Sequence, residues 1–231
     1  MTKIFYDGCD IAKFGSYPNV VGFTTNTTIM RQSNQLCYKT FYEANREAIQ
    51  GRPISFQIFS DYATTIVEQA RQIQSLGSSV YVKIPVINSQ GESLLPTIVA
   101  LAQEGVRVNI TAVFTREQLD QIASSVVGKT ETPMIVSVFG GRISDTGVSP
   151  QQMVKYAVDA YRSAPNVEVL WAGVKDNLIL GQADEVGCQI VTLPDTIMAR
   201  IGRLGQPLEH LSRDTVTSFL KDAVDGGLRI L

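Results

Sequence analysis

The chain has 231 residues, of which 44% are hydrophobic and 18% are charged. Its 20 Lys and Arg residues against 22 Asp and Glu residues give a formal charge of −2, so it lacks the dense cationic surface of a protein that coats nucleic acid. The low charged fraction is also unlike that of disordered chains, and the length suits either one barrel-sized domain or two small ones.

Eight short runs rich in Val, Ile and Phe follow one another along the chain, a pattern typical of buried β-strands. The predicted strands are Lys3–Asp7, Val20–Asn26, Ile54–Phe59, Val80–Pro85, Val106–Phe114, Met134–Phe139, Val167–Ala172 and Gln189–Leu193. Helical spacing between most of them predicts helices at Gln35–Gln50, Asp61–Leu76, Leu94–Glu104, Arg116–Ser124, Pro150–Ser163 and Asn177–Glu185. Ser93, Thr115 and Ser149 precede three of these helices, and we expect them to be N-caps.

Strands that alternate with helices predict a parallel α/β sheet. Eight repeats of roughly 29 residues favour closure into a compact (β/α)8 TIM barrel over an open doubly wound sheet. The barrel uses nearly the whole chain, so we expect a single domain over residues 1–231. A short helix near Thr196–Arg203 and a final helix near Asp214–Val224 follow the eighth strand. Residues 212–231 form a C-terminal helix and apolar tail that we expect to serve in contacts between subunits.

Alternate residues of a barrel strand point outward to the helices and inward to the axis. The outward parity is apolar, as in Val80, Val82 and Ile84 of the fourth strand. The opposite parity therefore faces the interior. Near the carboxyl ends of six successive strands it carries polar side chains, namely Asp7, Thr24, Asn26, Gln57, Lys83, Asn109, Thr111 and Ser137. Barrel enzymes have their active sites at this end, so we expect a site there.

An interior lysine is the most informative of these residues. A single buried Asn or Thr is usually a hydrogen-bonded core residue, whereas burial of an ammonium group is costly unless the group is paired or neutral. Lys83 is therefore either an ion-pair partner of Asp7 or an amine whose lowered pKa makes it a nucleophile toward carbonyls. We favour the second interpretation, which predicts Schiff-base chemistry on a ketone or aldehyde.

Six segments occur in the order and spacing of the transaldolase family. They are Phe5-Tyr6-Asp7, Gly22-Phe23-Thr24-Thr25-Asn26, Val82-Lys83-Ile84-Pro85, Val108-Asn109-Ile110-Thr111, Phe139-Gly140-Gly141-Arg142-Ile143 and Ile190-Val191-Thr192-Leu193-Pro194. The chain resembles the short branch of that family, which includes small transaldolases and fructose-6-phosphate aldolase, over nearly its whole length. Val-Lys-Ile-Pro after Thr-Thr-Asn on a predicted barrel is the most specific part of the match.

The resemblance implies a reaction without a metal or a cofactor. Lys83 corresponds to the lysine that forms an imine with the ketose, so that the C3–C4 bond breaks and a dihydroxyacetone unit stays on the enzyme. Asp7 corresponds to the carboxylate that removes and returns the proton of the C4 hydroxyl. The other polar positions correspond to amides that hold substrate hydroxyls (Asn26, Asn109), to lesser contacts (Thr24, Ser137) and to a hydroxyl that places water (Thr111).

The resemblance also implies positive charge for a terminal anion on both sugar substrates. Arg142 corresponds to the family's phosphate-binding arginine, and its guanidinium group suits a tetrahedral oxyanion. Lys175 corresponds to a second cation after the seventh strand. The family forms ring-type homo-oligomers, pentamers or decamers, partly through the C-terminal helix, so we expect an oligomer here as well.

The chain departs from the usual family pattern at Gly173 and Gln57, and Phe139 is a further position that distinguishes the two activities of the family. Gly173 stands where the family usually has Ser, which removes one donor to a phosphate and leaves room for another anion such as a sulfonate. Gln57 stands where transaldolases commonly have Glu and the aldolase has Gln, and a Gln cannot take a proton from water. Phe139 matches transaldolases, whereas the aldolase has Tyr. The last two positions therefore favour opposite activities.

Several other classes of protein are excluded by missing patterns. Cys9, Cys37 and Cys188 form no CxxC pair, and His210 is the only histidine, so a disulfide framework and a metal cluster are not expected. The N-terminal segment lacks the features of a secretory signal, and no run approaches about 18 apolar residues. We therefore expect a cytoplasmic protein that binds neither membranes nor nucleic acid.

The main hypothesis is a transaldolase that moves a dihydroxyacetone unit from a ketose to an aldose, as in the pentose phosphate pathway. A close rival is an aldolase that releases free dihydroxyacetone. A third hypothesis is a transaldolase for a sulfonated ketose such as 6-deoxy-6-sulfofructose, which Gly173 motivates. A barrel that binds sugar phosphates without turnover is the alternative of another class, and the set of Asp7, Asn26 and Lys83 argues against it.

Overall fold

A computed structural model describes residues 1–231 and divides them into two compact units, Met1–Met198 and Ala199–Leu231. Unit 1 holds eight parallel strands that close into a barrel in the order β1 to β8, and it confirms the predicted (β/α)8 fold. The strands are β1 (Lys3–Asp7), β2 (Val20–Thr24), β3 (Ile54–Gln57), β4 (Val80–Pro85), β5 (Val108–Val113), β6 (Met134–Val138), β7 (Val167–Trp171) and β8 (Ile190–Pro194).

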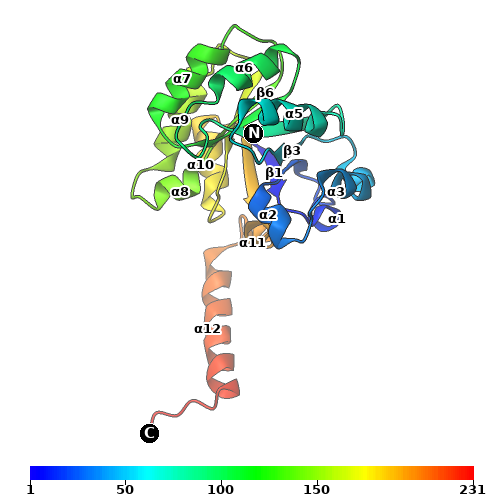
Figure 1. Ribbon diagram of the computed structural model, residues 1–231. Coiled ribbons are helices and arrows are strands. Elements are labelled where there is room, and N and C mark those ends of the chain that lie inside the picture. Colours follow the sequence, from blue (N-terminus) through cyan, green and yellow to red (C-terminus); the bar gives the residue numbers. More distant parts are fainter. The chain divides into compact units, whose positions relative to one another are not determined.

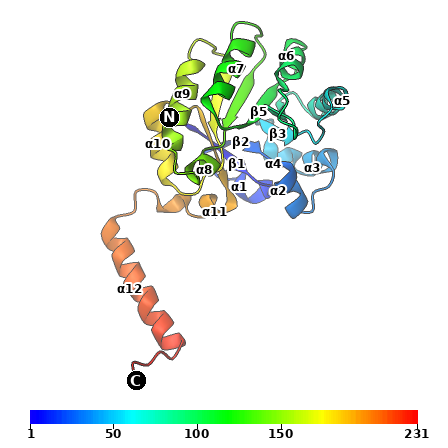
Figure 2. The same ribbon diagram turned by 60° about the vertical axis from the view of Figure 1, so that its left-hand side comes forward.

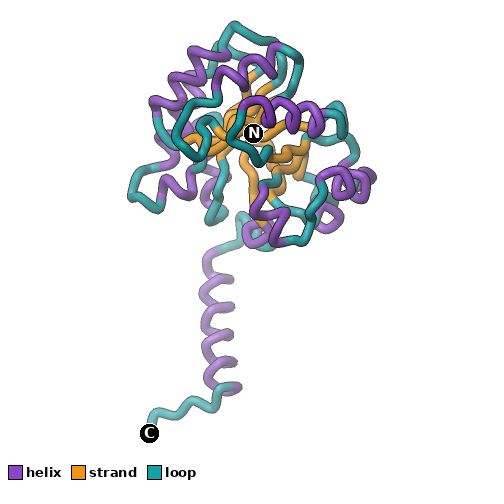
Figure 3. Tube along the Cα trace, in the orientation of Figure 1, coloured by secondary structure: helices purple, strands orange, loops and turns teal.

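Helices surround the strands of unit 1, as Figures 1 and 3 show. Those of unit 1 are α1 (Ile11–Phe14), α2 (Thr27–Gln32), α3 (Tyr38–Ala44), α4 (Arg46–Ile49), α5 (Ala63–Gln74), α6 (Leu95–Gln103), α7 (Arg116–Val126), α8 (Gly140–Ser144), α9 (Pro150–Ala160), α10 (Leu178–Val186) and α11 (Asp195–Met198). The turned view in Figure 2 places α5, α6 and α7 side by side along the outside of the sheet. This arrangement explains why the outward parity of the strands is apolar.

The prediction of one helix over Gln35–Gln50 is wrong, because the structure has two shorter helices there, α3 and α4. They meet at Asn45, whose side-chain amide donates to the carbonyl of Phe41 at 2.9 Å and whose backbone leaves the helical region. An Asn side chain that bonds to the local backbone in this way competes with the helix. The prediction missed the short helices α2 and α8, which lie between predicted elements.

Local capping chemistry decides where several elements begin. Thr115 caps α7 as expected, with its hydroxyl accepting from the amide of Gln118 at 3.2 Å in a complete capping box. Ser149 occupies the N-cap position of α9 without a side-chain bond, and the N-cap of α6 is the residue after Ser93. Asn26, expected at the end of the second strand, is instead the N-cap of α2.

An apolar layer fills the middle of the barrel. The side chains that form it are Phe5, Tyr81, Ile135, Leu170, Ala172 and Ile190. Phe5, Tyr81 and Ile135 have the parity predicted for the interior. Asp7 follows Phe5 by two residues, and Lys83 follows Tyr81 by two residues. The polar side chains near the carboxyl ends of the strands therefore stand on a packed apolar floor, not over an open channel.

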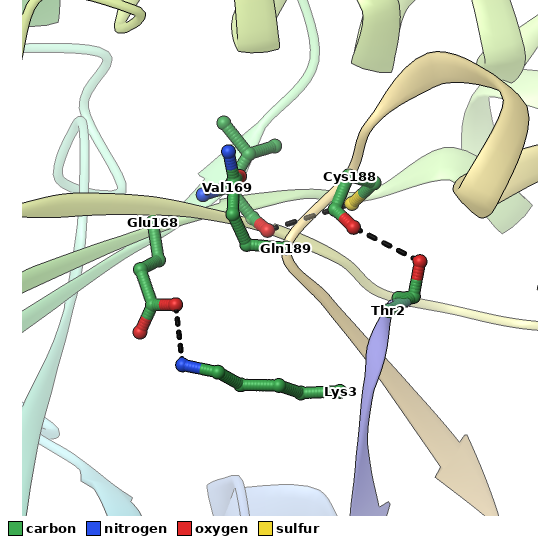
Figure 4. Close-up of polar contacts among 6 residues, drawn as sticks. All are labelled: Thr2, Lys3, Glu168, Val169, Cys188 and Gln189. Atoms are coloured by element: carbon green, nitrogen blue, oxygen red, sulfur yellow. Dashed lines mark hydrogen bonds and ion pairs between the residues drawn. The ribbon is translucent and has the colours of Figure 1, made fainter. Parts of the chain in front are cut away.

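The amino ends of the strands are joined by exposed polar contacts, which Figure 4 shows. The ammonium group of Lys3 lies 2.7 Å from the Glu168 carboxylate. The hydroxyl of Thr2 donates to the Cys188 carbonyl at 3.0 Å, and the Gln189 side chain accepts from the amide of Val169 at 2.8 Å. These contacts join β1, β7 and β8 at the end of the barrel opposite to the predicted site.

Unit 2 contains a short 3-10 helix, η1 (Ile201–Arg203), and the long helix α12 (Leu208–Asp225). The helix begins earlier than the expected Asp214, with Pro207 at its N-cap position. Its exposed apolar side chains include Val216, Phe219, Leu220 and Val224, whose spacing places them on one face. None of the helices in the structure has the length and hydrophobicity that a bilayer crossing requires.

Candidate active site

Lys83 lies at the centre of a group of interior side chains near the carboxyl ends of the strands. Its side chain comes from β4 and is only 3% exposed. The amine donates to the carbonyl of Thr25 at 3.2 Å, and it forms no salt bridge. Burial lowers the pKa of the Lys83 ammonium group, and the charge of Asp7 opposes part of this shift. A buried amine without a carboxylate in contact is suited to react in its neutral form.

Asp7, on β1, has a fixed hydrogen-bond donor. The hydroxyl of Thr24 on β2 donates to the Asp7 carboxylate at 2.7 Å, and the hydroxyl of Thr192 on β8 lies 2.6 Å from that of Thr24. Since the Thr24 proton is used toward Asp7, Thr192 is the donor of the second bond. Burial raises the pKa of Asp7, Asp195 adds to the rise, and Lys83 and Thr24 oppose it. A raised pKa makes this carboxylate a stronger base than an ordinary one, which suits it to general acid–base catalysis.

A second carboxylate lies beside Asp7 at the end of β8. The hydroxyl of Tyr6 donates to Asp195 at 2.5 Å, and it accepts from the amide of Asp10 at 3.1 Å. In the sheet, Asp7 pairs with Pro194, which immediately precedes Asp195. This pairing holds the Asp195 carboxylate close to Asp7. The sequence analysis did not single out this residue.

Asn109 is held by two serines on neighbouring strands. Its amide nitrogen donates to the hydroxyl of Ser55 at 3.0 Å, and its amide oxygen accepts from the hydroxyl of Ser137 at 2.7 Å. All three side chains are buried. The amide therefore has one orientation, with a second N–H left to donate to a ligand. Ser55 was not predicted, although it has the interior parity of Gln57.

Three further predicted residues lie around Lys83. Gln57 is its neighbour on β3, and its side chain is partly buried. Thr111 on β5 is 2% exposed, and its hydroxyl has no hydrogen-bond partner. Buried hydroxyls are normally bonded, so this hydroxyl is suited to bind a water molecule or a substrate group. The amide oxygen of Asn26 accepts from the backbone of Ile29 at 2.9 Å, which leaves the amide N–H groups as donors.

Close packing of glycines positions the segment after β6. A Cβ atom on Gly141 would lie 1.7 Å from the carbonyl oxygen of Gly173, and one on Gly140 would lie 2.0 Å from the indole nitrogen of Trp171. Gly173 itself has a φ of +73°, a left-handed conformation that strains any residue with a side chain. The contact with Gly141 and this conformation give a physical reason for the glycine where the family usually has Ser.

The two predicted anion-binding cations differ in their surroundings. Arg142 lies on α8, is exposed and forms no salt bridge. Lys175 is also exposed, but its ammonium group is in contact with the carboxylate of Asp145. Phe139 precedes α8, and its ring centroid lies 5.9 Å from the amine of Lys83. Arg142 therefore lies three residues after Phe139 without a salt-bridge partner, whereas Lys175 is paired with Asp145 at the surface.

Cavity size alone does not locate this site. A hollow of about 610 Å³ lies between α2, α3 and α5, and its lining includes Met30, Leu36, Tyr38 and Phe59 but not Lys83. The structure groups no three His, Cys, Asp or Glu side chains in the way that a metal ion would require. A reaction without a cofactor remains a prediction. The buried Lys83 amine and the neighbouring Asp7 therefore indicate the candidate site better than the size of a cavity does.

Known proteins were compared with the chain and its fold. A family model described as transaldolase/fructose-6-phosphate aldolase matches residues 4–227. A protein of Caldicellulosiruptor saccharolyticus named "Probable transaldolase" is 27% identical over 228 residues, 95% of this chain and 96% of that protein. A protein of Bdellovibrio bacteriovorus with the same name is 32% identical over 180 residues, 78% of each chain.

Solved structures share the fold at low identity. A thiamine phosphate pyrophosphorylase from Pyrococcus furiosus has a TM-score of 0.53 and 8% identity, covering 85% of this chain and 87% of that one. A protein of Burkholderia cenocepacia described as a putative lyase/mutase has a TM-score of 0.57 and 15% identity, with coverage of 96% and 88%. At these identities the two structures support the barrel fold and nothing about the reaction.

Proposed function

Because the chain belongs to the transaldolase/fructose-6-phosphate aldolase family, we propose that it transfers a dihydroxyacetone unit from a ketose to an aldose through a Schiff base on Lys83. The family and the names of its relatives make the chain a transaldolase or aldolase enzyme. The observation that carries the finer proposal is the Lys83 amine, which is 3% exposed and forms no salt bridge. Burial of such an amine without a charged partner opposes folding, and a catalytic role would explain why the chain retains it.

In the first half of the reaction, the neutral amine of Lys83 attacks the C2 carbonyl of the ketose. The carbinolamine loses water and gives an iminium ion, which accepts electrons. The Asp7 carboxylate takes the proton of the C4 hydroxyl, the C3–C4 bond breaks, and its electron pair moves into the iminium system to give an enamine. The shortened aldose leaves with its new aldehyde at the former C4.

The second half reverses these steps on another sugar. The enamine carbon attacks the aldehyde carbon of the acceptor, and the protonated Asp7 returns its proton to the new alkoxide. Water adds to the iminium carbon, the C–N bond breaks, and Lys83 is released as an amine. The unpartnered hydroxyl of Thr111 supports a role in placing this water.

Two amides in the site are suited to hold the three-carbon unit. The bonds of Asn109 with Ser55 and Ser137 leave one of its amide N–H groups for a ligand. The amide oxygen of Asn26 is used in the cap of α2, so its N–H groups are also left for a ligand. Thr24 and Ser137 act mainly on neighbours, Asp7 and Asn109, to which they donate. We assign them to positioning of the acid–base group and the amide.

An aldolase that releases free dihydroxyacetone is the second candidate, and Gln57 is the observation that favours it. A Gln can orient a water molecule but cannot accept its proton. Phe139 favours transfer, because its ring brings no hydroxyl to the amine, which lies 5.9 Å away. Gly173 keeps a sulfonated ketose open as a substrate, since no side-chain donor of a phosphate stands there.

Turnover with and without an acceptor separates these candidates. The enzyme is incubated with fructose 6-phosphate alone or together with an aldose phosphate, and free dihydroxyacetone is measured. Transfer predicts consumption of the ketose only when the acceptor is present. Release of dihydroxyacetone at the same rate without an acceptor would reject transfer in favour of the aldolase. If no phosphorylated or sulfonated ketose reacts, both the transaldolase and the aldolase proposals are rejected.

We also assign the exposed apolar face of α12 to contacts between subunits. Val216, Phe219, Leu220 and Val224 form a continuous apolar row on this helix. Exposed apolar rows of this kind mark interfaces between proteins. Sedimentation of the purified chain tests the assignment. We expect an oligomer that dissociates when Phe219 and Leu220 are both changed to Asp, whereas a monomeric wild-type chain would contradict it.

A further inference from the structure

A cavity of about 320 Å³ lies between the beginning of α7, the helix α8 and the beginning of α9. Two arginines from different elements, Arg116 and Arg142, line it. The rest of its wall is largely apolar and includes Phe114, Ile143, Val148 and Met153. Its volume is in the range of cavities that bind small molecules. A cavity with an apolar wall and two guanidinium groups is suited to an anionic ligand.

The charges of this cavity are not neutralised within the chain. Neither Arg116 nor Arg142 forms a salt bridge. The guanidinium group of Arg116 lies over the ring of Tyr156 on α9, 4.9 Å from its centroid, which leaves its N–H edge for a ligand. Glu117 is the one acidic residue in the lining, so two positive charges face one negative charge. An anion would restore the balance.

Two packed aromatic side chains connect the wall of the cavity with the Lys83 amine. Phe114 lines it and packs against Phe139, with the ring centroids 5.6 Å apart. The Phe139 ring in turn lies 5.9 Å from the amine of Lys83. Arg142 follows Phe139 by three residues, on the short helix that Phe139 begins. Two aromatic rings therefore separate Lys83 from the cavity that Arg116 and Arg142 line.

The two further anion-binding groups that the family resemblance implies beside Arg142 are not available in this chain. Gly173 carries no hydroxyl, and Lys175 is paired with the Asp145 carboxylate. An anion held by Arg142 thus needs a second cation from elsewhere. Arg116 is the unpaired cation that shares a cavity with it.

We propose that Arg116 and Arg142 together bind the terminal oxyanion of the sugar substrate in this cavity, and that Arg116 is a specificity-determining residue of the enzyme. The ligand class is a sugar with a tetrahedral anionic group, a phosphate or a sulfonate. This inference rests on the proposed function for the sugar part of the ligand. The anion site itself can be tested without turnover.

The first test measures the affinity for inorganic phosphate by phosphorus NMR line width, and the affinities for phosphate and for sulfate by fluorescence of Trp171. Trp171 is the only tryptophan, and its indole nitrogen faces Gly140 of α8, so its emission reports on the helix that carries Arg142. We expect Arg116→Gln to weaken phosphate binding about tenfold, because a charge-assisted hydrogen bond is lost. We expect Glu117→Gln to tighten binding, because the one opposing charge is removed. Arg71→Gln, which changes an exposed arginine on α5, is the matched control.

The second test compares sugars with and without the terminal anion. For a phosphorylated ketose, Arg116→Gln raises KM about tenfold and leaves kcat within about twofold, since the anion is bound equally before and during the reaction. For the same ketose without its anion, KM does not change. If a sulfonated ketose has a lower KM than the phosphorylated one, the sulfonate is the anionic group that the site prefers. A larger effect of Lys175→Gln than of Arg116→Gln would overturn the proposal.

The outcomes also separate this inference from the proposed function. Phosphate affinity that depends on Arg116 in an enzyme without any adduct on Lys83 would keep the anion site and reject the Schiff base. An adduct on Lys83 together with phosphate affinity that is the same in wild type, Arg116→Gln and Glu117→Gln would reject the anion site alone. Binding of phosphate by neither wild type nor variants also rejects it.

Discussion

The two ends of the barrel differ in the exposure and pairing of their charged side chains. At the amino ends of the strands, Lys3 lies 2.7 Å from Glu168, and the two side chains are 51% and 31% exposed (Figure 4). At the carboxyl ends, Lys83 is 3% exposed and forms no salt bridge, although Asp7 influences its pKa. The amino end thus carries an exposed ion pair, whereas the carboxyl end carries a buried amine that has no carboxylate in contact.

This difference distinguishes an ordinary surface ion pair from the residues that we propose to react. An exposed salt bridge such as Lys3–Glu168 contributes about 0–1 kcal/mol, and its loss disturbs little. An ammonium group buried without a partner in contact opposes folding, and its pKa falls as a consequence. A neutral amine is the form that attacks a carbonyl, so this state of Lys83 supports the proposed Schiff-base role.

Removal of the buried Lys83 amine is expected to have the largest effect on the difference between the two ends of the barrel. We expect Lys83→Met to abolish turnover, a loss of at least about 10⁴-fold, because no imine can form. The same change is expected to raise the free energy of unfolding by about 1 kcal/mol, since an apolar side chain replaces a buried cation. Steady-state kinetics and urea unfolding measure the two effects. A variant that loses stability as well would show that Lys83 is structural.

Replacement of the acid–base group separates the two chemical steps. Asp7→Asn keeps the polar contact with Thr24 but cannot take a proton. We expect C–C cleavage to slow by about 10²–10⁴-fold, while borohydride still traps a ketose on Lys83. Single-turnover kinetics with mass spectrometry follow both steps. Equal loss of trapping and cleavage would place Asp7 in imine formation instead.

The pH dependence of the reaction tests the neighbour of Asp7. Asp195 raises the pKa of Asp7 through its like charge, so Asp195→Asn is expected to lower it. The charges of Lys83 and Asp7 affect each other's pKa. The proposed reaction uses Asp7 as a carboxylate, so protonation of Asp7 at low pH is expected to stop it. The acidic limb of the kcat/KM profile should therefore move to lower pH in the variant. Asp184→Asn, at the opposite end of the barrel, is the control, and an equal shift in that variant would contradict this role.

The smallest effect is expected at the amino ends of the strands. Lys3→Met and Glu168→Gln each remove the exposed salt bridge and should lower the free energy of unfolding by no more than about 1 kcal/mol. Neither variant is expected to change kcat/KM. Urea unfolding and initial rates measure the two quantities. A change in kcat/KM of tenfold or more would show that the two ends are not functionally separate.

Much of the fold could be predicted, because the strand period is strict. The alternation in Val80–Pro85 and its neighbours fixes which residues face the helices and which face the axis, and the interior positions of Lys83, Asn109 and Ser137 follow from it. The barrel and the predicted parity are confirmed. The break at Asn45 was missed, because a side chain that bonds to the backbone leaves the apolar spacing unchanged.

The partners within the site were harder to predict. Ser55 and Thr192 have the interior parity, but a lone interior hydroxyl looks like any core residue until its partner is known. The contact of Lys175 with Asp145 joins two loops that are 30 residues apart, and no sequence period reports such a pair. The same holds for Tyr6 and Asp195, which only the pairing of β1 with β8 brings together.

The central claim is that chemistry is confined to the buried lysine at the carboxyl ends of the strands. Reductive trapping tests it most directly. The enzyme is treated at neutral pH with dihydroxyacetone and borohydride, and the modified lysines are mapped by peptide mass spectrometry. We predict a three-carbon increment on the peptide with Lys83 and none on the peptide with Lys3, whose side chain is exposed and lies 2.7 Å from the Glu168 carboxylate. An unmodified Lys83, or equal modification of the two lysines, would contradict the account.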